Sequence, residues 1–294
     1  MSGTALLQAI VDGILTGGVY ALMAAGLTLI FGVMDIINIA QGAMVVLGAY
    51  LSYELSAKAG IPLLPGLLIT VPVMFVLGVG MEFLFMRRVR EADRAAMSIL
   101  VTFAVAILIE GVLTRAFGVD YVQLHATYID RSIYVLGFYL PWIYLIGFGL
   151  AVVLLVVLYW MLYRTQFGRA VRASLQNRTA ADLIGINVDR TRMIAVGIGV
   201  AVTAVGGFAF GATNAFNPNS GYDLISRLLA IVILGGLGSI GGAMAAAVFM
   251  LVVNDVVAVA WSPTWAPMVF FFALVIVLSI RPQGLFGRSG VRAQ

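Results

Sequence analysis

The sequence predicts an all-α fold: a polytopic membrane helix bundle of about eight or nine membrane segments, with one or more broken helices. Three observations predict this class. The 294-residue chain is 62% hydrophobic and only 10% charged, with a mean hydropathy of +1.08, whereas soluble chains carry about 25% charged residues. Apolar stretches of spanning length recur along it, and arginines gather between them. We expect one membrane domain over residues 1–294.

Each predicted membrane segment is an apolar stretch, because a helix needs about 20 apolar residues to cross the hydrocarbon core. The first stretch follows no basic leader, so we interpret it as a helix rather than a cleaved signal peptide. The stretch at 224–238 is short for a crossing, and we expect it to be broken or re-entrant and buried against protein. The predicted segments are roughly 7–31, 40–57, 62–86, 97–117, 141–163, 193–213, 224–238, 241–260 and 266–280.

Most basic residues lie in three regions outside these segments. If each stretch crosses once, the three regions share one side, which the positive-inside rule makes cytoplasmic. The C-terminus is then cytoplasmic and the N-terminus outside. Membrane orientation also accounts for the pI near 9.5, so we expect no nucleic-acid partner. The basic residues are Arg87, Arg88, Arg90, Arg94, Arg164, Arg169, Arg172, Arg178, Arg190, Arg192, Arg281, Arg288 and Arg292.

The residue content argues against several chemistries. The chain has no cysteine and a single histidine, His125, so we expect no metal site. An intramembrane enzyme would need a nucleophile with its base, or paired acids on facing helices. No predicted segment contains a histidine and the acids are scattered, so we expect no catalytic residue. A phosphate-binding loop is also absent, and the only lysine, Lys58, lies at an outer boundary, so energy must come from another chain.

The run "LGGLGSIGGAMAAAV" at 234–248 contains a match to the dinucleotide fingerprint G-x-G-x-x-G. The fingerprint requires a preceding strand, which is missing here, so we expect no cofactor in this chain. Glycines in membrane helices let backbones approach closely, and Gly238 and Gly242 have the required spacing on one helix face. The other interpretation places Gly238 and Ser239 on a transport pathway, and both can hold.

A cluster of polar residues lies between the first two predicted membrane segments. Asn38 and Gln41 follow Asp35, and Gly32 and Gly42 flank the three. Irregular backbone at membrane depth is tolerated only where protein covers it or where it lines a cavity. We therefore predict that Asn38, Gln41 and Gly42 belong to a translocation pathway. The alternative is that Asp35 caps a helix at the cytoplasmic interface.

The longest basic loop, residues 164–192, contains a predicted short helix. Thr179 and Asp182 have capping-box spacing, and Gly185 suits the left-handed residue that ends a helix. Small and apolar side chains along this helix are typical of a knob that inserts into a groove of a partner. The alternative is that the knob packs back on its own bundle.

Four ionisable residues lie within or at the ends of the predicted segments. We expect Glu82 to pair near the cytoplasmic surface, about one turn from Arg87, and Glu110 and Arg115 to lie near the outer interface. Asp255, beside Asn254, could polarise a pathway or meet the outer interface before Trp261 and Trp265, which have the chemistry of an aromatic belt.

Four segments in order resemble permease subunits of branched-chain (hydrophobic) amino acid ABC importers. They are "GVYALMAAGLTLIFGVMDIINIAQGAM", "GRAVRASLQNRTAADLIGINVDR", "LGGLGSIGGAMAAAV" and "RPQGLFGR", and the resemblance covers nearly the whole chain. One departure concerns substrate: after Ile37-Asn38 the family usually reads Phe-Ala-His-Gly, whereas this chain has Ile39-Ala40-Gln41-Gly42.

The resemblance implies a multi-pass permease of a bacterial inner membrane, in contact with lipid, that forms half of a translocation pathway. It implies as partners a second, homologous permease, two cytoplasmic ATPases that bind ATP and Mg, and a periplasmic substrate-binding protein. Urea, short amides or aromatic acids remain alternative substrates, and an ion-coupled secondary transporter is the rival class. The family's coupling helix maps onto Thr179, Ala180, Ala181, Asp182, Leu183, Ile184, Gly185, Ile186 and Asn187.

Overall fold

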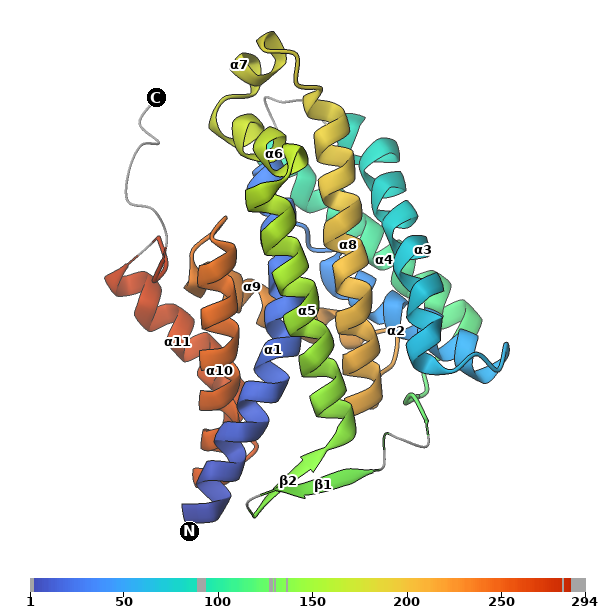
Figure 1. Ribbon diagram of the computed structural model, residues 1–294, viewed down its shortest axis with the longest axis vertical. Helices are drawn as coiled ribbons and strands as arrows, with labels where there is room; N and C mark the ends of the chain where they lie inside the picture. The colour runs from blue at the N-terminus through green and yellow to red at the C-terminus, as the bar shows by residue number, and fades with distance from the viewer. Residues whose placement is uncertain are drawn as a thin grey trace.

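The computed structural model describes residues 3–88, 94–126, 129, 131–135, 137–281 and 283–286; Arg90, Arg288 and Arg292 of the charge pattern lie outside them. The fold is an all-α bundle with one small β-hairpin (Figure 1). Its elements are α1 (Gly3–Met34), α2 (Gln41–Ala57), α3 (Leu63–Leu84), η1 (Met86–Arg88), α4 (Arg94–Phe117), β1 (Ser132–Val135), β2 (Phe138–Pro141), α5 (Trp142–Arg164), α6 (Gln166–Gln176), α7 (Arg178–Leu183), α8 (Val188–Thr213), α9 (Ser220–Gly235), α10 (Ile240–Ala260) and α11 (Ala266–Ile280).

The predicted fold class is confirmed, and every predicted membrane segment is helical. Within the described residues, six helices are long and apolar enough to cross a membrane: α1, α3, α4, α5, α8 and α10. The helices α2, α9 and α11 have only 17, 16 and 15 residues. At about 1.5 Å per residue these three fall short of a hydrocarbon core of about 30 Å. The short segment expected at 224–238 is therefore α9, which begins and ends earlier than predicted.

Two helices form the centre of the bundle. In both α1 and α8, 78% of the most apolar window is buried, against 28% to 33% in the other four spanning helices. α1 packs against α5, α8 and α10, and α8 packs against α2 and α3 (Figure 1). The outer helices expose apolar side chains such as Leu68, Val76 and Val156. This arrangement suits a lipid environment, where exposed apolar side chains carry no penalty.

The hairpin was not anticipated from the sequence. Strands β1 and β2 pair antiparallel, with Ser132 opposite Pro141 and Val135 opposite Phe138. It lies at the end of the bundle opposite α6 and α7 (Figure 1). Pro141 ends β2, and α5 starts at the next residue.

The predicted pairing of Gly238 with Gly242 on one helix face is wrong. Gly238 lies in the turn between α9 and α10, with φ +83°, and no atom lies near the place of its missing Cβ. Gly242 does allow a close approach, but to Gly235: a Cβ on Gly242 would lie 2.1 Å from the Gly235 carbonyl oxygen. Left-handed glycines break the helix between the two residues that meet.

We expect Gly242→Ala to destabilise the protein, because the added methyl has no room against the backbone of α9. Overpacking of this kind costs about 1–3 kcal/mol. Gly241→Ala is the matched control, since nothing lies within 4 Å of a Cβ on the neighbouring glycine. The measurement is the thermal unfolding midpoint of each purified variant in detergent. Equal midpoints for the two variants would show that α9 and α10 are not this close.

Candidate transport and coupling sites

The break between α1 and α2 holds a buried amide pair. Asn38 and Gln41 are both 0% exposed. The Asn38 side-chain amide donates to Gln41 Oε1 at 3.1 Å, and the Gln41 amide donates to the Thr203 hydroxyl of α8. Asp35 has φ 56°, a left-handed residue just after the end of α1. Asp35 therefore closes the end of α1, where its backbone amide donates to the Phe31 carbonyl oxygen at 2.8 Å.

The predicted pathway residues divide into two groups. Asn38 and Gln41 connect the start of α2 to α8, and Gly42 is buried, where a Cβ would lie 2.1 Å from the Gly221 carbonyl oxygen of α9. Gly238 and Ser239 instead line a cavity of about 460 Å³ beside Thr28 and Arg172. Ser239 also caps α10 by accepting a hydrogen bond from the Gly242 amide at 3.1 Å. The pathway role of each residue stays a prediction.

Gln41→Leu is expected to lower stability, because it leaves the buried Asn38 amide and the Thr203 hydroxyl without their shared partner. Such a loss costs about 1–3 kcal/mol. The control is Gln176→Leu, which removes an exposed amide at the end of α6. The thermal unfolding midpoints of the two purified variants check this stability prediction.

Uptake by Asn38→Leu in an assembled complex tests the predicted pathway role of Asn38. Unaltered uptake would remove Asn38 from the pathway.

The basic loop is almost entirely helical. It consists of α6, α7 and the first turn of α8, which begins five residues earlier than the predicted segment. The short helix is confirmed, but its cap differs: Asn177, not Thr179, accepts the hydrogen bond of the Ala180 amide, at 3.0 Å. Gly185 follows the helix end with φ +86°, the left-handed conformation that its position predicts.

The apolar side chains of α7 face two ways. Leu183 and Ile184 are 83% and 74% exposed, whereas Ala181 is 2% exposed and faces its own chain. The expectation that Ala181 inserts into a partner is therefore wrong. Ile186 is half-buried, and the remaining members of the predicted set are exposed: Thr179, Ala180, Asp182, Gly185 and Asn187. The outward knob is formed by Leu183 and Ile184 at the end of α7.

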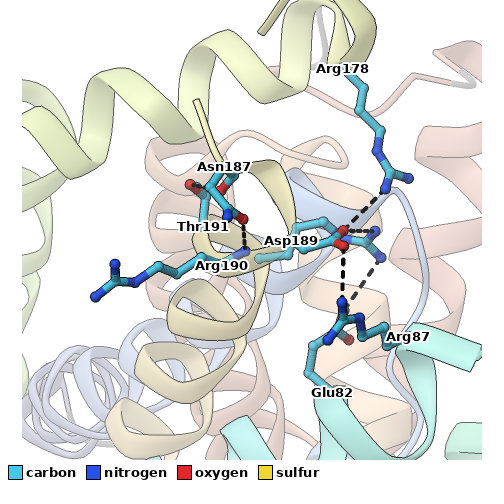
Figure 2. Close-up of polar contacts among 8 residues, drawn as sticks. Glu82, Arg87, Arg178, Asn187, Asp189, Arg190 and Thr191 are labelled. Carbon is cyan, nitrogen blue, oxygen red and sulfur yellow. Dashed lines mark hydrogen bonds and ion pairs between the residues drawn. The ribbon is translucent and has the colours of Figure 1, made fainter. Parts of the chain in front are cut away.

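An ionic cluster connects α7 to the membrane helices (Figure 2). Asp189, in the first turn of α8, accepts from Arg178 of α7 at 3.1 Å. The same carboxylate lies 3.8 Å from Arg87 of η1 and 4.0 Å from Arg192, one turn further along α8. One carboxylate thus contacts the basic groups of three elements. These ion pairs place α7 beside the first turn of α8 and beside η1.

Glu82 does not pair with Arg87 at the surface as expected. Its side chain is 3% exposed, and Arg192 Nη2 lies 3.5 Å from its Oε1; the Arg192 side chain is 5% exposed. Arg87 pairs with Asp189 instead. The reason is that α8 passes over the end of α3 and places Arg192 over the buried carboxylate. This ion pair joins α3 to α8 inside the bundle.

Glu110 and Asp255 also have specific partners. The Tyr222 hydroxyl of α9 donates to Glu110 of α4, so Glu110 joins two helices. Asn254 donates to Asp255 at 3.0 Å. Trp261 and Trp265 stack with ring centroids 5.5 Å apart just after α10. Their place in an aromatic belt stays a prediction.

Sequence reasoning missed an ion pair on α9. Arg227 Nε lies 3.0 Å from Asp223 Oδ2, one turn away. Both line a cavity of about 450 Å³ at the junction of α8 and α9. The spacing of the two residues in an otherwise apolar stretch could have revealed them, because charges in membrane segments are functional candidates.

The chain is similar to known transport proteins over nearly its full length. The family model described as the permease component of branched-chain amino acid transport systems matches residues 9–279. The high-affinity branched-chain amino acid transport system permease protein LivH of Escherichia coli (strain K12) is 28% identical, with 97% of this chain and 96% of LivH covered. The corresponding protein BraD of Pseudomonas aeruginosa is 27% identical, with 97% of each chain covered.

Proposed function

The chain belongs to the family of permease components of branched-chain amino acid transport systems, and from this premise we propose that it forms half of the translocation pathway of an ABC importer. Its relatives are transport permeases, not enzymes, and its six apolar helices make it a multi-pass membrane protein. The proposed cargo is a branched-chain or other hydrophobic amino acid, moved into the cytoplasm.

The proposed complex supplies what this chain lacks. A second, homologous permease completes the pathway, two cytoplasmic ATPases bind ATP and Mg, and a periplasmic binding protein delivers the substrate. The proposed location is the bacterial inner membrane, with α6, α7 and the C-terminus on the cytoplasmic side. The arginines at that end of the bundle support this orientation through the positive-inside rule.

The exposed end of α7 is the observation that carries the proposal. A short capped helix presents Leu183 and Ile184 outward, and its Arg178 is anchored through Asp189 to α8 and η1. A secondary transporter would couple to ions through its own carboxylates and has no need for such a knob. A knob tied to the helices of the pathway is what a permease driven by separate ATPases requires.

The experiment is to co-express the tagged chain with the ATPases and the second permease of the proposed complex, and to purify it through the tag. We expect all partners to be recovered in a stable complex, and ATP turnover to rise when the substrate-loaded binding protein is added. Recovery of the chain alone, with no ATPase bound under any detergent condition that keeps it folded, would contradict the proposal.

A further inference from the structure

The cavity at the α8–α9 junction is a polar pocket in an apolar bundle. Tyr20 of α1 and Phe210 of α8 line it together with Asn214, Asn219, Asp223 and Arg227. Its lining extends from the middle of α1 to the C-terminal end of α8. That end of α8 points toward the hairpin, away from α6 and α7 (Figure 1). In the proposed orientation this is the side from which the binding protein delivers substrate.

Arg227 is the residue that most needs an explanation. It lies two turns inside α9, or about 10 Å along the helix axis, where a charge is costly. Its side chain is 22% exposed, its guanidinium carbon lies 5.7 Å from the centre of the Phe270 ring, and its counter-ion Asp223 is 67% exposed. The closest approach of the ion pair uses Nε, and the Tyr20 hydroxyl is a second polar partner of the guanidinium. A guanidinium has five N–H donors, more than these two partners occupy.

We propose that this pocket is where the permease contacts the charged ends of its substrate, with Arg227 binding the α-carboxylate and Asp223 the α-ammonium of a zwitterionic amino acid. Phe210 supplies apolar surface for the side chain, and the Tyr20 hydroxyl contacts the Arg227 guanidinium. Asn219, which makes no capping hydrogen bond, adds an amide. Without substrate, Arg227 and Asp223 neutralise each other. When a zwitterion binds, its carboxylate takes the place of Asp223 beside Arg227, and its ammonium takes the place of Arg227 beside Asp223.

This replacement of the Arg227–Asp223 ion pair by the two charges of the substrate also selects the class of substrate. A cationic ligand would compete for Asp223 and leave the part-buried Arg227 without its counter-ion, whereas an anionic ligand would bring no ammonium for Asp223. A zwitterion supplies both charges. A neutral amide such as urea would provide no charge for either group. The pocket therefore favours zwitterionic amino acids over urea, short amides and aromatic acids lacking an amine. This inference rests on the proposed function.

The test is uptake of radiolabelled L-leucine by proteoliposomes that contain the whole complex and its binding protein. We expect Arg227→Met, which keeps an apolar stem without the charge, to reduce uptake about tenfold or more, and Arg227→Lys to keep part of it. The double variant Arg227→Met with Asp223→Asn restores local neutrality. A purely structural ion pair would regain uptake in the double variant, whereas a substrate contact stays defective.

The outcomes separate this inference from the proposed function. If the wild-type complex takes up no amino acid, the proposed function fails. If the wild type is active and assembled Arg227→Met transports normally, or the double variant recovers, the pocket assignment is wrong.

A second measurement tests the pocket without any variant of Arg227, so it holds even if Arg227→Met does not assemble. The chain has no cysteine, so Asn219→Cys places a single thiol in the pocket and Tyr134→Cys places one on the exposed hairpin. We expect millimolar L-leucine to slow modification of the first thiol by a methanethiosulfonate reagent, but not the second. Equal rates with and without leucine at Asn219→Cys would overturn the proposal.

Discussion

Replacing Leu183 with glutamate is expected to detach the ATPase subunits from the permease while leaving its membrane helices folded. Leu183 is 83% exposed in the chain, so the new carboxylate meets water in the isolated permease. In the complex the same carboxylate would be buried in an apolar groove of the ATPase, at a cost of several kcal/mol unless it finds a counter-ion. Ile184→Glu should act in the same way, since Ile184 lies beside it and is 74% exposed.

The measurement is recovery of ATPase subunits with the purified variant, together with the thermal midpoint of the permease. Gln176→Glu is the control, because it adds the same charge to an exposed position on α6. Ala181→Glu is the contrasting variant: its side chain is buried in its own chain, so it should lower the thermal midpoint as well. Full ATPase recovery with both Leu183→Glu and Ile184→Glu would remove the coupling role of α7.

Arg192→Met is expected to destabilise the permease itself. It removes the guanidinium that lies 3.5 Å from the Glu82 carboxylate, and both side chains are almost fully buried. Removing one partner of a buried ion pair costs about 3–5 kcal/mol, because the remaining buried charge loses that counter-ion. The consequences are a lower thermal midpoint and a lower yield of membrane-inserted protein.

Two further variants locate the cause of this loss. Arg190→Met removes an exposed arginine of the same helix and should be nearly neutral. Adding Glu82→Gln to Arg192→Met should recover part of the lost stability, because the buried carboxylate is then neutral. If Arg192→Met alone is as stable as the wild type, Glu82 and Arg192 do not join α3 to α8.

The membrane segments and the α7 helix could be predicted because they depend on local patterns. Apolar stretch length fixes a membrane helix, and glycine at 185 fixes a helix end through its φ of +86°. The limits of the short α9 could not be placed as well, because apolar residues continue past Gly235 into a turn made by glycines with positive φ.

Pairings between distant segments could not be predicted from the sequence. Glu82 lies five residues from Arg87, yet its partner is Arg192, because the packing of α8 on α3 decides which basic group covers the carboxylate. Gly242 meets Gly235 because the turn between α9 and α10 brings the ends of these two helices together. The two faces of α7 also depend on tertiary contacts, so sequence alone could not separate buried Ala181 from exposed Leu183.

Energised uptake is the decisive measurement for the proposal that ATP hydrolysis in other chains drives transport through this permease. Proteoliposomes containing the purified complex would be given substrate-loaded binding protein on the side of β1 and β2, with ATP and Mg on the side of α7. We expect L-leucine to accumulate only with ATP, and to continue doing so after ionophores collapse proton and sodium gradients. Accumulation by this permease without ATP, driven by an ion gradient and abolished by the ionophores, would show that separate ATPases do not drive its transport.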